Sequence, residues 1–397
     1  MNALSGRRVV FVVAGEVLGG AERNAILLAA RFARVEGAVV TILALDDSPG
    51  RARAVAEADG ISWTSVRTPW VGGRLARLAS LLRVALALRR LRPDVLLPST
   101  NLANVTCGLT WRLTGARLCV WNQCDVLGTR RFSRRLFRRA LHASPIAVTT
   151  AFHARDWLVT SWGFDPRRVH VIRSEVSLPA PVDSREDWRA RLGIASADFV
   201  ACMIGHLHEG KDHDTLLRAW RLAVDVIRVE GKEAVLLLAG RPAGNEDAVK
   251  GLAFDLDLRR HVQFLEDVAD ISGLLAAVDL AVFSSRSECL GRGATEPMYA
   301  GLAVAGTDIP GIREAVGEQS LRFLATPGDA EALAKVILRL ARDPALRAEV
   351  GTANAELIRR RQSAETTSKL YTDLIAQKLR SVPASRIVPT AAAGEIA

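Results

Sequence analysis

Two carboxylates lie close together in the second half of the chain, on either side of a loop that contains glycine. Glu288 and Glu296 fall within Ser-Glu-Cys-Leu-Gly-Arg-Gly-Ala-Thr-Glu, between strand-like runs at 279–283 and 302–305. Amides at the carboxyl end of a strand, with the N-terminus of a following helix, can bind phosphate. Ionised carboxylates accept hydrogen bonds from hydroxyl groups. These residues therefore predict a ligand with both groups, such as a nucleotide-sugar.

A glycine turn follows the first strand-like run of the chain. Gly15, Gly19 and Gly20 precede a helical pattern that begins at about Ala21. Such a turn brings amides and a helix N-terminus to one point, which favours a phosphate. The spacing fits neither G-x-G-x-x-G nor a Gly-Lys-Ser/Thr ending, so it disfavours a dinucleotide-dependent dehydrogenase and a P-loop enzyme. A tight turn without a ligand is the alternative interpretation.

The second half has a loop of the same kind after its own first strand-like run. Gly205, His206 and Lys211 lie in this loop, just before a helical pattern. A lysine beside a helix start is a phosphate ligand by type. We expect the two loops to face each other from two domains, with the ligand between them.

The elements that position these residues are predicted from short apolar runs that alternate with longer helical patterns. This alternation is typical of parallel sheets wrapped by helices, and 397 residues favour two domains. The predicted strands of the first half are 9–13, 39–45, 94–97, 118–121, 146–149 and 169–172. Those of the second half are 199–204, 235–239, 262–265, 280–283, 302–305 and 321–324.

Domain boundaries follow from the same pattern. We place the first domain at 1–178 and the second at 183–363, joined by a segment that contains Pro179 and Pro181. A helix at 364–379 either finishes the second domain or crosses back to the first. Residues 380–397 lack periodicity and are predicted to be a disordered tail.

Charge is unevenly distributed along the chain. The net charge is +10, yet residues 1–180 alone hold 26 basic and 12 acidic residues. Six arginines are interleaved with Phe132, Leu136 and Phe137. This pattern has two open interpretations: a basic amphipathic helix that binds an anionic membrane surface, or a solvated helix face. These arginines are Arg130, Arg131, Arg134, Arg135, Arg138 and Arg139. No stacking platform accompanies them, which disfavours nucleic acid.

Other features bear on location and metals. No uninterrupted apolar run is long enough for a membrane span, and the first residues lack a signal cleavage site. We therefore expect a cytoplasmic protein, with peripheral contact at the inner membrane surface as an option. Five cysteines without a C-x-x-C pair predict buried thiols, and nothing in the chain requires a metal.

Taken in order, several motifs resemble those of the retaining glycosyltransferases of family 4. That family has the GT-B architecture, an α/β fold in which two doubly wound, Rossmann-like domains face each other across a cleft. The matching segments are Gly19-Gly20-Ala21-Glu22-Arg23, Gly205 with Lys211, Ala239-Gly240-Arg241-Pro242, Phe264-Leu265 with Asp270, the E-x7-E segment with Gly301-Leu302-Ala303-Val304, Thr307-Asp308-Ile309-Pro310-Gly311, and Pro327-Gly328-Asp329.

The resemblance implies roles for the carboxylates and the loops. Glu296 would bind the ribose hydroxyls, and Glu288 would bind hydroxyls of the transferred sugar. Lys211 and a protonated His206 would offset charge on the departing nucleoside diphosphate. The remaining donor-binding positions are the amides of Leu290, Gly291 and Arg292, with Gly205 in the same domain and Gly19 and Gly20 in the opposite one.

Two departures from the family pattern affect these roles. His206 stands where the family usually has an arginine for the diphosphate. Asn122 or Gln123 replaces a histidine that many members place near the sugar. Our candidates for contact with the sugar or the acceptor are Asn101, Asn122 and Gln123.

The resulting hypothesis is a retaining glycosyltransferase that needs no metal or cofactor. Its donor would be a nucleotide-sugar, and its acceptor a glycan or a lipid-linked molecule of the cell envelope. A nucleotide-sugar epimerase on the same fold and a non-catalytic nucleotide-sugar-binding protein remain alternatives.

Overall fold

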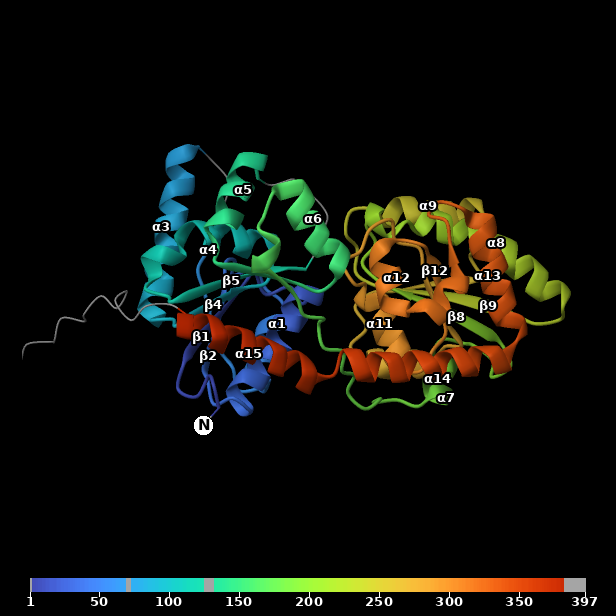
Figure 1. Cartoon of the computed structure of the whole chain (residues 1–397). Coiled ribbons are helices and arrows are strands. Elements are labelled where there is room, and N and C mark those ends of the chain that lie inside the picture. The colour runs from blue at the N-terminus through green and yellow to red at the C-terminus, as the bar shows by residue number, and fades with distance from the viewer. Residues whose placement is uncertain (1, 69–72, 125–131, 382–397) are drawn as a thin grey trace, which may run out of the picture. The chain divides into compact units, whose positions relative to one another are not determined.

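The computed structural model of the chain describes residues 2–68, 73–124 and 132–381. The chain divides into two compact units (Figure 1). The first unit comprises Met1–Glu175 with Ala364–Ala397, and the second comprises Val176–Ser363. The boundary between them thus lies a few residues before the proline-containing segment that we expected to join the domains.

The first unit is built on a parallel sheet in the order β3-β2-β1-β4-β5-β6-β7. Strands buried on both faces are near-continuous apolar runs, which is why most of them could be predicted. The missed strand, Ser62–Ser65, lies at the sheet edge and has a single large apolar residue, Trp63. The strands are β1 Arg8–Val13, β2 Val39–Ala44, β3 Ser62–Ser65, β4 Val95–Pro98, β5 Leu118–Gln123, β6 Ile146–Thr149 and β7 Val169–Val171.

Helices pack on both faces of this sheet. One core joins Phe11 and Phe32 to Ile375 of the C-terminal helix, and another joins Trp121 to Phe137 and Trp162. The helices are α1 Gly20–Arg34, α2 Ala52–Ala58, α3 Arg74–Leu91, α4 Asn101–Thr114, α5 Arg134–Ala143, α6 Phe152–Trp162, the 3-10 turn η1 Pro166–Arg168 and α15 Ala364–Ser381.

Helix α15 packs within the first unit, although the residues just before it belong to the second. Tyr371, Leu374, Ile375 and Leu379 are buried against α1 and the sheet. The helix ends at Ser381, so residues 380 and 381, which we expected in a disordered tail, are helical. Basic side chains in its last turn complement the negative end of the helix dipole. The rest of the predicted tail lies outside the described residues.

The second unit repeats the plan with a parallel sheet in the order β10-β9-β8-β11-β12-β13. Its strands are β8 Phe199–Ile204, β9 Ala234–Ala239, β10 Val262–Leu265, β11 Leu280–Phe283, β12 Val304–Thr307 and β13 Leu324–Ala325. Its helices are α7 Arg185–Arg191, α8 His213–Val229, α9 Glu246–Asp255, α10 Ile271–Ala277, α11 Arg292–Tyr299, α12 Pro310–Val316, α13 Ala330–Arg342 and α14 Pro344–Arg361, with 3-10 turns η2 Glu209–Lys211 and η3 Glu318–Phe323.

Two strands of this unit differ from the predictions. The strand predicted at 302–305 begins at Val304, because the amides of Gly301 and Leu302 still bond back to carbonyls of α11. The strand predicted at 321–324 is mostly the 3-10 turn η3. Leu321 and Leu324 are three residues apart, which suits a 3-10 turn as well as an apolar run.

The strand orders define where ligands can bind. In each sheet the chain builds outward from one central strand and then returns to that strand's other side, at β1 and β4 in the first unit and at β8 and β11 in the second. Open α/β sheets bind ligands outside the carboxyl ends of strands at such a reversal. The segments with Gly19, Asn101, His206 and Glu288 follow these four strands.

Candidate functional site

In the second unit, the reversal point brings together two residues that the sequence places 77 positions apart. Lys211 Nζ donates a hydrogen bond to Glu288 Oε1 at 2.7 Å. The two side chains are 13% and 18% exposed, so solvent screens their attraction only partly. The hydroxyl of Ser284, just after β11, donates to the carbonyl of Lys211 at 2.9 Å and ties the two loops together.

Gly205 makes room for this ion pair. A Cβ at that position would lie 3.0 Å from Cε of Lys211 and 3.3 Å from its Nζ. The lysine side chain therefore runs directly over the backbone at the end of β8. Lys211 Nζ also lies 4.9 Å from the centroid of the Phe283 ring, a distance at which the ring face attracts the ammonium group.

A second ion pair holds Glu296. The Nε and one terminal nitrogen of Arg292 donate to Glu296 Oε1 at 3.1 and 2.7 Å. The two residues lie one turn apart on α11, and the Glu296 side chain is only 7% exposed. The arginine therefore offsets a nearly buried carboxylate and fixes its position.

The loop before α11 has little freedom. Gly291 adopts φ +68°, and a Cβ there would lie 2.9 Å from Ile312 Cδ1. A Cβ at Gly311 of α12 would lie 2.4 Å from the carbonyl oxygen of Glu288. Because the first amides of a helix lack intrahelical acceptors, the start of α11 is suited to a phosphate. Ligand contact by the amides of Leu290, Gly291 and Arg292 stays a prediction.

The environment of His206 differs from our expectation. Burial, and then the nearby charges of Arg241, Lys211 and His208, lower its pKa below the usual 6.5. His206 is therefore mainly neutral near pH 7, whereas we expected it to be protonated. A bound diphosphate would favour the protonated form, because an anion stabilises a nearby cation.

Two other histidines shape the same loop. His208 Nδ1 accepts a hydrogen bond from the amide of Gly210 at 3.1 Å, which stabilises the turn that presents Lys211. Burial, with Lys211 and His208 nearby, lowers the pKa of His213 to about 4. Both histidines are thus neutral supports of Lys211 at pH 7.

In the first unit, Gly19 and Gly20 form the start of α1, as predicted for a glycine turn. Gly19 is the N-cap residue and makes no side-chain cap. A Cβ on Gly19 would lie 2.8 Å from Oε2 of Glu22, so this carboxylate occupies the positive end of the helix dipole. A phosphate at the same point would compete with Glu22 for that position.

The structure brings Gln123 and Asn101 together. The Gln123 amide nitrogen donates to Asn101 Oδ1 at 3.2 Å, and Trp121 Nε1 donates to Gln123 Oε1 at 2.8 Å. Gln123 is 1% exposed. Its side chain therefore positions Asn101 in this structure, rather than facing solvent as a sugar contact would.

Asn122 is held by residues that sequence reasoning missed. The Tyr371 hydroxyl donates to Asn122 Oδ1 at 2.9 Å, and both groups are buried. The Asn104 side chain bonds to the backbone N–H and C=O of Asn122. One signal for Tyr371 was present, because a tyrosine on the apolar stripe of a helix usually needs a hydrogen-bond partner.

A small cavity with both apolar and polar walls lies beside this contact. Its volume is about 30 Å³, roughly enough for one or two water molecules. Its walls include Asn122, Tyr371, Asn24, Ser99, Thr150 and Ser174. The Asn24 side chain donates to the Ser174 hydroxyl at 2.8 Å on the wall of this cavity.

Within the described ranges, no group of three or more His, Cys, Asp or Glu side chains is arranged to hold a metal ion. Cys107, Cys119, Cys202 and Cys289 are buried and Cys124 is half-buried. Burial raises the pKa of Cys119 and Cys202 to about 12, which makes them unreactive at neutral pH. Nor does any helix of residues 2–68, 73–124 and 132–381 combine the length and the hydropathy that crossing a bilayer requires.

Comparison with known proteins identifies relatives for both halves. The family described as Glycosyltransferase Family 4 matches residues 18–177, and Glycosyl transferases group 1 matches residues 184–357. A D-inositol 3-phosphate glycosyltransferase of Streptomyces scabiei is 30% identical over 241 residues, 58% of this chain and 54% of that relative. The corresponding protein of Nocardia farcinica is 31% identical over 191 residues, 46% of this chain and 41% of that relative. The match thus spans about half the length of these curated relatives.

Solved structures resemble nearly the whole chain. Anabaena HepE in complex with UDP and glucose superposes with a TM-score of 0.81 at 22% identity, covering 94% of this chain and 100% of that chain. Sucrose-phosphate synthase from Thermosynechococcus elongatus has a TM-score of 0.75 at 17% identity, with coverage of 94% and 100%. At these identities the likeness establishes the fold, and it confirms the predicted GT-B class. With two family models that together extend from residue 18 to residue 357, the chain belongs to the family 4, or group 1, glycosyltransferases.

Proposed function

We propose that this protein transfers a sugar from a nucleotide-sugar to a hydroxyl group of an acceptor, with retention of the anomeric configuration. The proposal rests on two ion pairs, Lys211–Glu288 and Arg292–Glu296, at the strand reversal of the second unit. Structural neighbours solved with UDP and with UDP-glucose support a nucleotide-sugar as the donor.

Glu296 is suited to the ribose of the donor. Its carboxylate is nearly buried, and its Oε1 accepts hydrogen bonds from Nε and a terminal nitrogen of Arg292. A carboxylate oxygen can accept a hydroxyl hydrogen bond but cannot bind phosphate. Such a bond to a charged group contributes about 1.5 to 3 kcal/mol.

Lys211 would bind the diphosphate of the donor, and Glu288 would bind its sugar. The lysine can leave the carboxylate and approach the diphosphate, while Glu288 accepts hydrogen bonds from sugar hydroxyls. Stabilising the charge that develops on the leaving group is the largest catalytic effect that we assign to the site. The start of α11 adds its partial positive charge at the same place.

Retention need not involve a covalent sugar. In a retaining glycosidase a carboxylate attacks the sugar. We assign Glu288 to hydrogen bonds with the sugar hydroxyls and not to attack on the anomeric carbon. We favour attack of the acceptor on the same face from which the diphosphate leaves, with a donor phosphate oxygen taking the acceptor proton.

The acceptor would be bound by the first unit and would belong to the cell envelope, as a glycan or a lipid-linked molecule. The basic character of residues 1–180 supports an anionic surface as the place of reaction. Exposed arginines on α5 contribute to this charge: Arg134, Arg135, Arg138 and Arg139. Arg130 and Arg131 lie outside the described residues.

The apolar face of α5 limits how a membrane contact could form. Phe137, Ala140 and Leu141 of this helix are fully buried in the core of the first unit. Of our two open interpretations, an amphipathic helix for a membrane surface would need this apolar face, and the core uses it. Membrane contact through α5 would therefore be electrostatic and would weaken with salt.

Donor binding tests the proposal directly. A ligand at about 100 times its dissociation constant adds about 2.7 kcal/mol of stability, so UDP-, GDP- and ADP-glucose can be compared by thermal unfolding. Glu296→Gln should weaken binding of the stabilising donor about 10- to 100-fold. Glu288→Gln should change donor affinity by less than about threefold and lower transfer at least tenfold.

The matched control is Glu230→Gln, which neutralises an exposed carboxylate elsewhere in the same unit. Unchanged donor affinity in Glu296→Gln would refute the ribose assignment. If donor alone is converted to an epimer, the protein is an epimerase. If donor binds but no acceptor receives sugar from wild type or His206→Arg, the protein is a non-catalytic binder.

A further inference from the structure

The outer edge of the first sheet leaves backbone groups without a strand partner. Among the strands of residues 2–68, 73–124 and 132–381, β7 is the last in the sheet order and pairs with β6 alone. The amide of Ile172 donates to the carbonyl of Thr149 at 2.8 Å, on the β6 side. Since successive residues of a strand direct their N–H and C=O groups to opposite sides, those of Val169 and Val171 point away from β6. The N–H of Val169 donates to the carbonyl of Pro166 in the turn η1, so the groups offered to a further strand are the C=O of Val169 and the N–H and C=O of Val171.

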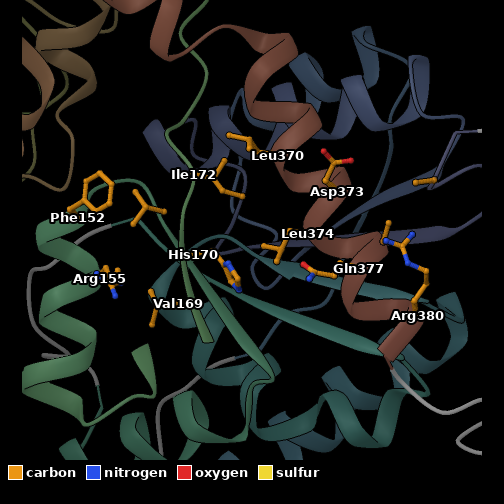
Figure 2. Close-up of a pocket in the computed structure, with 13 residues that line it drawn as sticks. Phe152, Arg155, Val169, His170, Ile172, Leu370, Asp373, Leu374, Gln377 and Arg380 are labelled. Atoms are coloured by element: carbon orange, nitrogen blue, oxygen red, sulfur yellow. The ribbon is translucent and has the colours of Figure 1, made fainter. Parts of the chain in front are cut away.

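This edge lies in a groove of about 760 Å³ between two helices. Figure 2 shows Phe152 and Arg155 of α6 on one side, residues of α15 on the other and His170 of β7 between them. Val169 packs in the core with α6, and Ile172 packs in the core with α15. An added strand would thus be covered on both faces, as the inner strands of the sheet are.

The groove is cationic and partly apolar. Arg155 and Arg380 line it, with Asp373 as the acidic residue of its lining. Burial, and then the charge of Lys378, lower the pKa of His170, so Lys378 is a further cation close to the groove. Two large apolar side chains that line the groove, Phe152 and Leu370, are about half exposed, at 51% and 47%.

We propose that this groove binds an extended, acidic peptide segment of a partner protein, which adds to β7 as a further strand. Backbone groups of Val169 and Val171 would bond to the peptide backbone, Arg155 and Arg380 would pair with acidic side chains, and Phe152 and Leu370 would contact apolar ones. Strand addition of this kind takes affinity from backbone bonds and specificity from alternate side chains.

Two features favour a peptide over other ligands. An unpaired strand edge offers alternating donors and acceptors, which match a peptide backbone and have no counterpart in a lipid chain. The short length of β7 also protects the edge against uncontrolled pairing, so the arginines and the apolar contacts would add to the affinity that the few backbone bonds supply. The proposal is independent of the sugar-transfer chemistry, which involves other elements.

The experiment removes one outward backbone donor, the N–H of Val171. Val171→Pro removes the outward N–H and leaves the bond of Ile172 to β6, and proline is accepted at edge strands whose N–H faces away from the sheet. Val171→Ala is the matched control, because it shortens the side chain and keeps the N–H. The double variant Arg155→Glu/Arg380→Glu tests whether the two arginines pair with acidic side chains of the peptide. Thermal unfolding of each full-length variant checks that the fold is retained.

Two phage-displayed libraries of nine-residue peptides serve as probes, one with Asp or Glu at alternate positions and one with Lys or Arg there. The acidic library should be enriched on the wild-type protein. By fluorescence polarisation, the enriched peptides should bind Val171→Pro at least tenfold more weakly and Val171→Ala within threefold of wild type. The double arginine variant should lose the preference for acidic peptides.

Three results would overturn the proposal. One is the absence of enrichment above an uncoated surface. Another is equal binding to Val171→Pro and Val171→Ala, which would mean that the peptide does not add as a strand. The third is binding of phosphatidylglycerol vesicles that depends on Arg155 and Arg380 while the peptides do not bind, which would make the groove a lipid site.

Discussion

Two carboxylates of the candidate site in the second unit, Glu288 and Glu296, are each paired with a cation. Glu296 is the more buried partner of its pair, at 7% exposed, and Glu288 is 18% exposed. Removing one member of a buried pair leaves an uncompensated charge, which destabilises the fold as well as the ligand complex. Donor affinity and stability therefore have to be measured together for Arg292 and Glu296, and likewise for Lys211 and Glu288.

His206 allows a prediction about rate and pH. His206→Arg introduces a permanent charge at a position where the protein holds a mainly neutral histidine, so kcat/KM at pH 7.5 should rise about tenfold. Because the wild-type pKa is below 6.5, protonation grows only as pH falls below that value. The ratio of the wild-type kcat/KM to that of His206→Arg should thus increase as the pH is lowered from 8 to 5.5.

The measurement is a kcat/KM profile against pH for both proteins. His153→Arg, which adds the same charge on α6 of the other unit, is the control and should leave the profile unchanged. A rate of His206→Arg equal to or below wild type at every pH would show that charge at this position does not assist the leaving group.

Tyr371 allows a prediction about the acceptor side. Tyr371→Phe leaves Asn122 Oδ1 buried without its donor, which should lower the free energy of unfolding by about 1 to 3 kcal/mol. If Asn122 contacts the acceptor, the acceptor KM should rise while donor affinity stays the same. Urea unfolding and steady-state kinetics measure the two effects.

Tyr299→Phe is the control, because the chain has two tyrosines and Tyr299 lies on α11 of the second unit. A stability loss without any change in acceptor KM would assign Tyr371 a structural role alone.

At the scale of elements, a network of charges anchors α7 to the sheet of the second unit. Asp279, just before β11, accepts hydrogen bonds from Arg185 at 2.6 Å and Arg189 at 2.9 Å, and from the amide of Val200 in β8 at 2.8 Å. Arg189 is 4% exposed and also donates to backbone carbonyls, including that of Ala277. The ends of β8, β11 and α7 thus meet at one carboxylate.

Asp279→Ala should destabilise the second unit by about 3 kcal/mol or more, because it leaves the buried guanidinium of Arg189 without its anion. The denaturation midpoint in urea measures this loss. Asp225→Ala removes an exposed partner of Arg221 on α8 and should cost less than about 0.5 kcal/mol. Equal losses in the two variants would contradict the anchoring role.

Elements differed in how well the sequence predicted them. Inner strands such as β8 and β11 are continuous apolar runs, and their ranges match the predictions. The edge strand β3 is only half-buried, so the apolar signal that marks a strand is weak there. The turn η3 was mistaken for a strand because three of the four residues at 321–324 are large and apolar, with only Arg322 between them.

For the whole molecule, the assignment of α15 predicts how truncation divides the chain. A chain that ends at Ser363 loses Tyr371, Leu374, Ile375 and Leu379 from the core of the first unit. Burial of a leucine or isoleucine side chain stabilises a protein by about 1.5 to 3 kcal/mol, so the loss exceeds the stability of many domains. The first unit should unfold, and the second should stay folded.

Hydrogen exchange with mass spectrometry checks this outcome. Amides of β1 should lose protection in the truncated chain, and those of β8 should keep it. A chain that ends at Ser381 is the control and should match the full-length protein in both strands. Retained protection of β1 after truncation at Ser363 would mean that α15 is dispensable for the first unit.

The sequence by itself determined the fold class, the number of domains, most inner strands and the family, because these depend on local periodicity and on short motifs. It also singled out Glu288, Glu296 and Lys211 by residue type. Only the tertiary structure decided which groups meet, such as Lys211 with Glu288 and Tyr371 with Asn122, which lie 77 and 249 positions apart. Burial likewise decided the neutral state of His206 and the inward role of Gln123. The physical reason is that desolvation and long-range pairing depend on the packed neighbours of a residue, and a linear pattern does not specify those neighbours.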